Sequence, residues 1–246
     1  MTEKKRERSF AGKKDNYQIY LKQINALARV ARLISSGMYL DELLKLIVHV
    51  TAEVMQSKIC SLMLLDPETK ELVIKSTQSV SERYNNKPNI KLGEGIAGMV
   101  AKDNKLLCSG DVRKDRRYVN REIARSEAIV SLASVPLAIK GKVIGVLNCY
   151  TSEEHEFSPA ELDILTTVAA QAAAAIENAE LDLRARSAEE ALQTRKLIER
   201  AKEILSQDAN MPPSEAFRLI QKQSMDKRKT MKEIAEAIIL AKDIRS

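Results

Sequence analysis

One long stretch without glycine or proline constrains this chain more than any other feature. Ser158 and Pro159 fit an N-cap followed by proline at the first helical position, and neither glycine nor proline then occurs before Pro212. Because these two residue types are the strongest helix breakers, one helix can run from Ser158 to Leu205. We therefore expect a long helix that joins two separate parts of the chain.

The first part of this expected helix carries an apolar seam of mostly small side chains. Its members recur at spacings of three and four residues: Leu162, Leu165, Ala169, Ala172, Ile176, Ala179 and Leu183. Such a seam either pairs with a second subunit or packs on the sheet of its own domain, and the sequence leaves both open. The pattern falters at Arg186 and Glu190, and another stripe begins at Ala191, which indicates a domain boundary.

The net charge of +6 is concentrated at the two ends of the chain. Residues 1–15 hold six Lys or Arg against three acids, and residues 195–246 hold twelve against eight, which leaves −1 between them. A basic C-terminal segment is compatible with phosphate contacts and also with an ordinary soluble bundle. With 4% aromatic residues and no Trp, stacking platforms for single-stranded nucleic acid are hard to build.

The segment before the long helix has the pattern of an α+β domain. Apolar periodicity predicts two helices, over residues 25–36 and 40–56. Strand patterns predict two hairpins and one short strand, over residues 58–65 with 72–76, 131–139 with 143–150, and 106–109. This order favours an antiparallel sheet with helices on one side. The polar segment 78–91 is expected to be a long loop.

Cysteine usage and hydropathy indicate the cellular compartment of the protein. Cys60, Cys108 and Cys149 are odd in number, widely spaced and set in apolar stretches, so we expect buried free thiols. No run approaches the roughly 20 apolar residues that span a bilayer, and the N-terminus lacks the apolar core of a signal peptide. We expect a cytoplasmic protein without a membrane partner.

Several spaced segments before and at the start of the long helix resemble a GAF domain. They are Gly93–Gly98 (GEGIAG), Cys108–Asp111 (CSGD), Val135–Leu137 (VPL), Gly145–Asn148 (GVLN) and Phe157–Asp163 (FSPAELD). The resemblance covers residues 24 to 180 and implies a six-stranded antiparallel sheet with a ligand cavity on one face. The identity of that ligand differs between members, so the sequence predicts only an unidentified small-molecule effector.

Two ligand classes of the family are disfavoured. Asn148 is followed by Cys149, where cyclic-nucleotide-binding relatives have Asn-Lys, and Cys108 is followed by Ser109, where bilin-binding relatives have a histidine. The glycines of Gly93–Gly98 resemble the start of a dinucleotide fingerprint, but that motif works only between a parallel strand and a helix. Packing of a tight turn is the favoured interpretation.

Catalytic and metal sites need clustered histidines, cysteines and carboxylates. The two histidines, His49 and His155, fall in a helix and in a polar turn. We therefore expect a chain that is not an enzyme and has no metal or certain cofactor.

The last fifty residues have the pattern of three short amphipathic helices. The stripe of residues 195–205 stops at Asp208–Pro213, and a second helix follows, for which Ser214 is a candidate cap. A basic break at Asp226–Lys229 precedes a third helix with Thr230 as its candidate cap. A small three-helix bundle is expected.

This bundle resembles the ANTAR domain, an RNA-binding antitermination module. The resemblance rests on Ile198–Lys202 (IERAK), Glu215–Leu219 (EAFRL), Met225 and Glu233–Ile238 (EIAEAI). It implies that the domain binds RNA hairpins in nascent transcripts as a homodimer and prevents a terminator from forming, often under the control of an attached sensor. An attached GAF-like domain fits that arrangement.

Exposed cations are the residues expected to contact RNA, since hairpins offer phosphates and loop bases. They are Arg195, Lys196, Arg200, Lys202, Arg218, Lys222, Lys227, Arg228, Lys229 and Lys232. For each, a solvated helix face is the competing interpretation. Five apolar positions that carry the resemblance are expected to form the core of the bundle: Ala201, Phe217, Met225, Ile234 and Ala235.

The sequence thus predicts an α+β chain with four parts. They are a basic N-terminus (1–19), a GAF-like sensory domain (20–165), a connecting helix with a dimerising seam (166–194) and an ANTAR-like domain (195–246). The leading hypothesis is a signal-responsive RNA-binding antitermination regulator. The alternative is a non-catalytic adaptor whose bundle binds a partner protein in a signalling complex.

Overall fold

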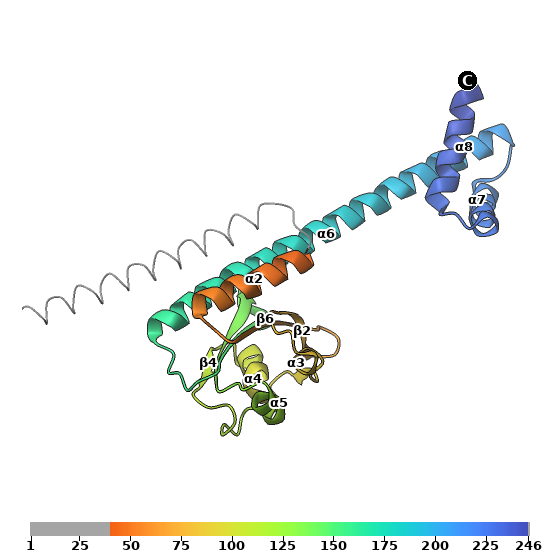
Figure 1. The fold of residues 1–246 in the computed structure, drawn as a ribbon. Helices are drawn as coiled ribbons and strands as arrows, with labels where there is room; N and C mark the ends of the chain where they lie inside the picture. Colours follow the sequence, from red (N-terminus) through yellow and green to blue (C-terminus); the bar gives the residue numbers. More distant parts are fainter. Residues whose placement is uncertain (1–39, 246) are drawn as a thin grey trace, which may run out of the picture. The chain divides into compact units, whose positions relative to one another are not determined.

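The computed structural model describes residues 40–245 (Figure 1). The basic segment 1–19 and the helix expected over residues 25–36 lie outside the described residues. Contacts within the chain divide it into two units, Met1–Glu180 and Leu181–Ser246. Each unit is described by itself.

The first unit is built on a six-stranded antiparallel sheet, as the resemblance to GAF domains implied. Its strands in chain order are β1 (Ile59–Leu65), β2 (Glu71–Thr77), β3 (Ile90–Lys91), β4 (Leu107–Ser109), β5 (Ser131–Ile139) and β6 (Lys142–Thr151). Their order across the sheet is β3-β2-β1-β6-β5-β4. Both expected hairpins, β1–β2 and β5–β6, are present, and β1 pairs with β6 at the centre.

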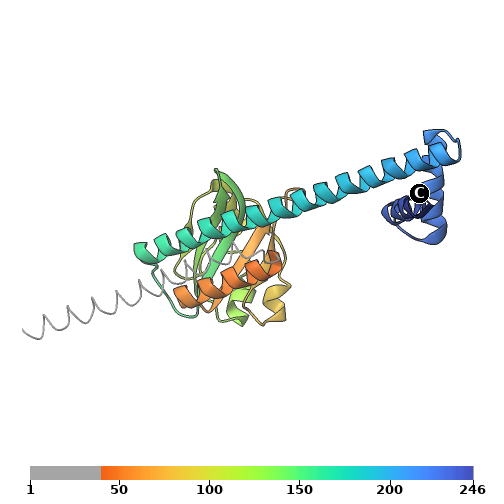
Figure 2. The same ribbon diagram turned by 90° about the horizontal axis from the view of Figure 1, so that it is seen from above.

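Helices cover both faces of this sheet, so the expectation of helices on one side was wrong. Helix α2 (Leu40–Met55) and the first part of α6 (Pro159–Asp208) lie side by side on one face (Figure 2). The opposite face carries α3 (Glu82–Asn85), α4 (Gly95–Asp103) and α5 (Arg121–Ser126). None of these three was predicted, because each is short and lacks a sustained apolar period.

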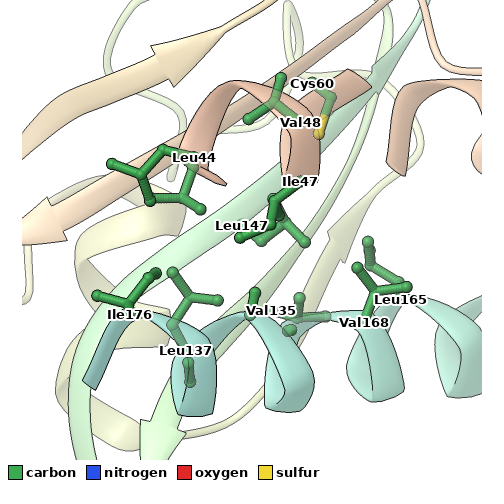
Figure 3. Packing of buried hydrophobic residues seen from close by; sticks show 14 of the residues in the cluster. Leu44, Ile47, Val48, Cys60, Val135, Leu137, Leu147, Leu165, Val168 and Ile176 are labelled. Atoms are coloured by element: carbon green, nitrogen blue, oxygen red, sulfur yellow. The ribbon is translucent and has the colours of Figure 1, made fainter. Parts of the chain in front are cut away.

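The face under α2 and α6 holds the first of two apolar cores (Figure 3). Ile47 and Val48 of α2 contact this core from above the sheet, and Leu165 and Ile176 enter it from α6. Strand residues such as Leu147 complete it, since successive side chains of a strand point to opposite faces. The second core lies on the other face, among α3, α4 and α5.

The apolar seam of α6 is used inside the first unit. Leu165, Ala169, Ala172 and Ile176 are at most 1% exposed in the core against the sheet and α2. The interpretation that the seam packs on its own domain therefore holds for these four residues. Beyond Glu180 the helix surface changes, and Leu181 and Leu183 are 53% and 67% exposed.

The polar segment 78–91, expected as one loop, contains α3 and β3. The side chain of Ser81 caps α3 by accepting a hydrogen bond from the Tyr84 backbone N–H. The Tyr84 ring is fully buried, and Ile90 is 7% exposed on the edge strand. Two isolated apolar side chains thus fix a segment whose composition is otherwise that of a loop.

The second unit consists of the last part of α6 with α7 (Pro213–Lys227) and α8 (Met231–Arg245), which confirms the expected three helices. Its core contains five buried side chains: Ala201, Ile220, Ile234, Ala235 and Ile239. Phe217 and Met225, predicted as core, are 40% and 72% exposed. Ala216 and Ile220, one turn apart, take the inward face of α7 instead.

Helix ends follow the expected capping chemistry in two of three cases. Ser158 and Glu161 form a capping box at the start of α6, and Thr230 and Glu233 form another at α8. The prediction of Ser214 as a cap was wrong, since Pro212 occupies the N-cap and Pro213 the first helical position. None of the helices among the described residues is long and apolar enough to cross a membrane.

Candidate nucleic-acid interface and sensory core

The predicted cations of α6 lie on two different flanks of the helix. Arg195 and Lys202 are seven residues apart and share one flank, whereas Lys196 and Arg200, four residues apart, share another. The buried Ala201 lies between Arg200 and Lys202. The four cations therefore do not form one surface.

Contacts show which neighbour each flank faces. The Lys202 ammonium lies 2.8 Å from Glu199 Oε2 and 5.9 Å from the centre of the Phe217 ring of α7. The Arg200 guanidinium lies 3.5 Å from Asp243 Oδ1 of α8. The Lys202 flank thus borders α7, and the Arg200 flank borders α8.

Helix α7 carries two further exposed cations. Arg218 and Lys222 are exposed and one turn apart, and no acid among residues 40–245 lies within ion-pair distance of either. Phe217, adjacent to Arg218, exposes 40% of its surface. An exposed aromatic ring can stack on an unpaired base, and free cations on the same helix can contact phosphates.

The turn between α7 and α8 carries the remaining basic residues. Arg228 adopts the left-handed conformation with φ of 51°, and the Lys229 backbone N–H donates to the Ser224 carbonyl oxygen. Lys229 is 3.9 Å from Glu233, whereas Lys227 and Lys232 are exposed and without an ion pair among the described residues. The turn presents a second basic cluster next to the C-terminal end of α7.

The ten predicted cations are therefore divided between surfaces. Lys202, which shares its flank with Arg195, lies near the Phe217 ring, Arg218 and Lys222 lie on the exposed side of α7, residues 227–229 and Lys232 lie at the turn, and Lys196 and Arg200 lie on the α8 side. Phe217, predicted as core, lies at the surface. The sequence pattern could have indicated this exposure, because Ala216 and Ile220 already supply the apolar positions of the buried face at helical spacing.

The glycine string of the first unit serves packing. Gly93 donates its N–H to the Gly98 carbonyl, and a Cβ at position 98 would overlap the Lys91 carbonyl oxygen. The strand before it, β3, is a two-residue antiparallel edge strand, so the strand–helix geometry of a dinucleotide fingerprint is not formed.

The histidines have structural partners. His155 Nε2 lies 2.9 Å from Glu161 Oε1 at the start of α6, and His49 Nδ1 lies 2.9 Å from the Lys45 carbonyl oxygen. Within residues 40–245, no group of three or more His, Cys, Asp or Glu side chains could hold a metal ion.

The fold and surface together define a protein with an α+β unit of six antiparallel strands and a basic helical unit. Residues 38–177 match the GAF domain model and residues 186–239 match the ANTAR domain model. The chain therefore belongs to the GAF domain family and carries an ANTAR domain in its C-terminal part.

Known proteins resemble parts of the chain. A methyl sulfide methyltransferase-associated sensor from Methanosarcina acetivorans is 30% identical over 171 residues, which are 68% of this chain and 17% of that protein. The transcriptional regulatory protein PdtaR from Mycobacterium tuberculosis is 48% identical over 50 residues, 20% of this chain and 24% of PdtaR. The chain thus spans less than a quarter of the length of either relative.

A solved structure resembles the first unit. It is the GAF domain of a phosphoenolpyruvate-protein phosphotransferase from Coxiella burnetii, with a TM-score of 0.60 and 26% identity. The match covers 68% of this chain and 98% of that domain.

Proposed function

We propose that the chain is a signal-responsive, RNA-binding transcription antitermination regulator, with its GAF domain as sensor and its ANTAR domain as the RNA-binding module. The observation that carries the proposal is the ANTAR match over residues 186–239, the same helices that bear the unpaired cations and the exposed Phe217. The similarity to a transcriptional regulatory protein supports the same role.

The RNA surface that we propose centres on Phe217. Lys202 lies 5.9 Å from the centre of its ring, Arg218 and Lys222 add exposed cations on the same helix, and the basic turn of residues 227–229 with Lys232 follows at the end of α7. A hairpin would place its loop bases on the Phe217 ring and its phosphates on the cations. Holding one hairpin keeps that RNA from pairing into a terminator, which requires no catalysis by the protein.

Charge reversal tests this surface. The double variant R218E/K222E should bind stem-loops upstream of terminators with lower affinity, and its salt slope, log K against log salt, should be shallower by about two, since each lost phosphate contact removes about 0.9. Fluorescence anisotropy with labelled hairpins at several salt concentrations measures both quantities.

The matched control reverses two lysines at the β5–β6 turn. Lys140 and Lys142 are exposed and belong to the first unit, so K140E/K142E makes the same charge change outside the ANTAR domain. Equal loss of binding in the two double variants would show that only net charge matters. Absence of any salt-sensitive binding by the unaltered chain would end the proposal.

A homodimer is part of the proposal. Past the first unit, α6 exposes Leu181 and Leu192, each by 53%, on one side of the helix, and burial of such side chains against a second copy is favourable. Light scattering after size-exclusion chromatography should give twice the chain mass, and L192E should shift the protein toward the monomer. A monomeric unaltered chain would exclude this part.

A further inference from the structure

A buried lysine in the first unit lacks a counter-charge. Lys87, directly after α3, is 7% exposed, and its ammonium lies 4.0 Å from the centre of the Tyr84 ring and 5.9 Å from that of Tyr150. Among residues 40–245, no carboxylate lies within 4.0 Å of this ammonium. Burial lowers the pKa of Lys87 to about 7. Because an unpaired buried charge is costly, its presence requires an explanation.

Polar side chains interrupt the apolar sheet face beneath this lysine. Ser61, Asn148 and Ser134 are register partners across β1, β6 and β5. Asn148 points to the same face as its strand neighbours Val146 and Tyr150, which belong to the core under α3, α4 and α5. The three polar residues are buried. They form a polar floor in the middle of that core.

Only one of the two polar atoms of the Asn148 amide has a hydrogen-bond partner among the described residues. The Ser134 hydroxyl donates to Asn148 Oδ1 at 2.7 Å, whereas Asn148 Nδ2 has no hydrogen-bond partner among the described residues. Asn148 is 0% exposed, so water does not satisfy this donor from the surface. An unused buried donor is unfavourable, so a bound acceptor at Nδ2 would remove a penalty.

Tyr84 joins the lysine to the polar floor. Its hydroxyl donates to Ser61 Oγ at 3.0 Å, while the face of its ring lies under the Lys87 ammonium. The Tyr150 ring meets the Tyr84 ring edge-on at 6.1 Å between centroids. Tyr84 therefore contacts the cation with its ring and, with its hydroxyl, the register partner of the residue that carries the free amide donor.

We propose that this site, formed by Lys87, Asn148 and the rings of Tyr84 and Tyr150, binds a small organic carboxylate. The carboxylate pairs with the Lys87 ammonium, which moves off the Tyr84 ring, and an oxygen of the ligand accepts a hydrogen bond from Asn148 Nδ2. The organic part lies against the tyrosine rings. Lys87 and Tyr84 both belong to the segment of α3, so ligand binding changes the position of that segment on the sheet.

The proposal deepens the sensor half of the proposed function and does not depend on RNA binding. Calorimetry on the full chain without RNA therefore separates its failure from failure of the regulator proposal. The probes are acetate, benzoate and succinate, each compared with its uncharged amide. Acetamide, benzamide and succinamide keep the shape of the acids and remove the charge.

We expect at least one of the three acids to bind saturably at millimolar concentration, and its amide to bind at least tenfold more weakly. K87M should reduce the affinity for that acid to the level of the amide. The matched control K91M removes an exposed lysine four residues away and should leave the dissociation constant unchanged. Thermal unfolding checks that both variants are folded, and N148L serves as a second variant should K87M not fold.

Three results would overturn the proposal. They are saturable binding by none of the three acids, equal affinity for an acid and its amide, and unchanged affinity for the acid in K87M or in N148L.

Discussion

The sulfur atoms of Cys60 and Cys149 lie 3.8 Å apart on the neighbouring strands β1 and β6. Both cysteines are 0% exposed in the core under α2 and α6, and both are free thiols. This confirms the expectation of buried free thiols for these two. Cys108 differs, because it is half-buried on the edge strand β4.

Thiol labelling should separate these cysteines. Burial, and then the neighbouring Cys149, raise the pKa of Cys60, and the thiolate is the reactive form, so Cys60 is protected by protonation as well as by packing. With dithiobis(nitrobenzoate), Cys108 should be the one of the three that reacts in the folded protein, and C108S should abolish that reaction. Reaction of Cys60 or Cys149 faster than global unfolding would contradict the packing described.

The Lys87 ammonium should make stability depend on pH. Burial lowers its pKa from 10.5 to about 7, so between these values the unfolded chain binds more protons than the folded one. The free energy of unfolding should therefore rise from pH 7 to pH 9, by at most about 1.4 kcal/mol per pH unit. Above pH 9, Cys60 and the buried Tyr84, Tyr118 and Tyr150, whose pKa values are raised, oppose this trend.

The measurement is denaturant unfolding followed by near-UV circular dichroism, which reports on tyrosines because the chain has no Trp. K87M should be more stable than the unaltered chain at pH 7 and should lose most of the slope. K91M, altered at an exposed position, should keep it. An identical slope in K87M would show that another group causes the pH dependence.

The sequence predicted the strands well because their signals are local. Apolar runs bounded by turn residues, such as 131–139 and 143–150 around Gly141, define β5 and β6 without reference to the rest of the chain. Helices α3 and α5 depend instead on single side chains, such as Tyr84, whose burial is decided by the sheet beneath them. Local periodicity carries no such information.

The candidate sites were less predictable for a related reason. Residue type identified the cations and helical spacing separates Lys202 from Arg200, but which neighbour each faces requires the packing of α6 against α7 and α8. Nothing in the string Asn-Asn-Lys-Pro-Asn indicates that Lys87 is buried, because lysine at such positions is normally exposed.

Gly98 should tolerate no larger side chain. A Cβ at this position would overlap the Lys91 carbonyl oxygen and lie 3.1 Å from the Gly93 nitrogen, so backbone would have to move. G98A should lower the free energy of unfolding by about 2 kcal/mol, as overpacking of a core does. G110A is the matched control, since a Cβ there meets nothing within 4 Å. Equal stability of the two variants in denaturant unfolding would contradict the close approach.

Loss of the capping box at the start of α8 should destabilise that end of the helix. Thr230 Oγ1 accepts from the Glu233 N–H at 3.2 Å, and Glu233 Oε2 accepts from the Thr230 N–H at 2.8 Å. T230A should cost about 1 kcal/mol, which corresponds to about fivefold faster hydrogen exchange at the start of α8. Mass spectrometry of peptides covering residues 231–236 measures this exchange.

Ser214 supplies the matched control for the capping prediction, because it has the residue type of a cap while Pro212 holds the N-cap position of α7. S214A should leave hydrogen exchange in α7 unchanged.

Low pH should weaken the capping box of α8, since hydrogen bonds from Thr230 lower the pKa of Glu233. A carboxylate whose pKa is lowered by folding stabilises the fold at pH values above its pKa in the unfolded chain. It loses that contribution as the pH falls through its pKa in the folded chain. The T230A effect should therefore shrink below about pH 4, and an effect of constant size would show that the hydroxyl acts without Glu233.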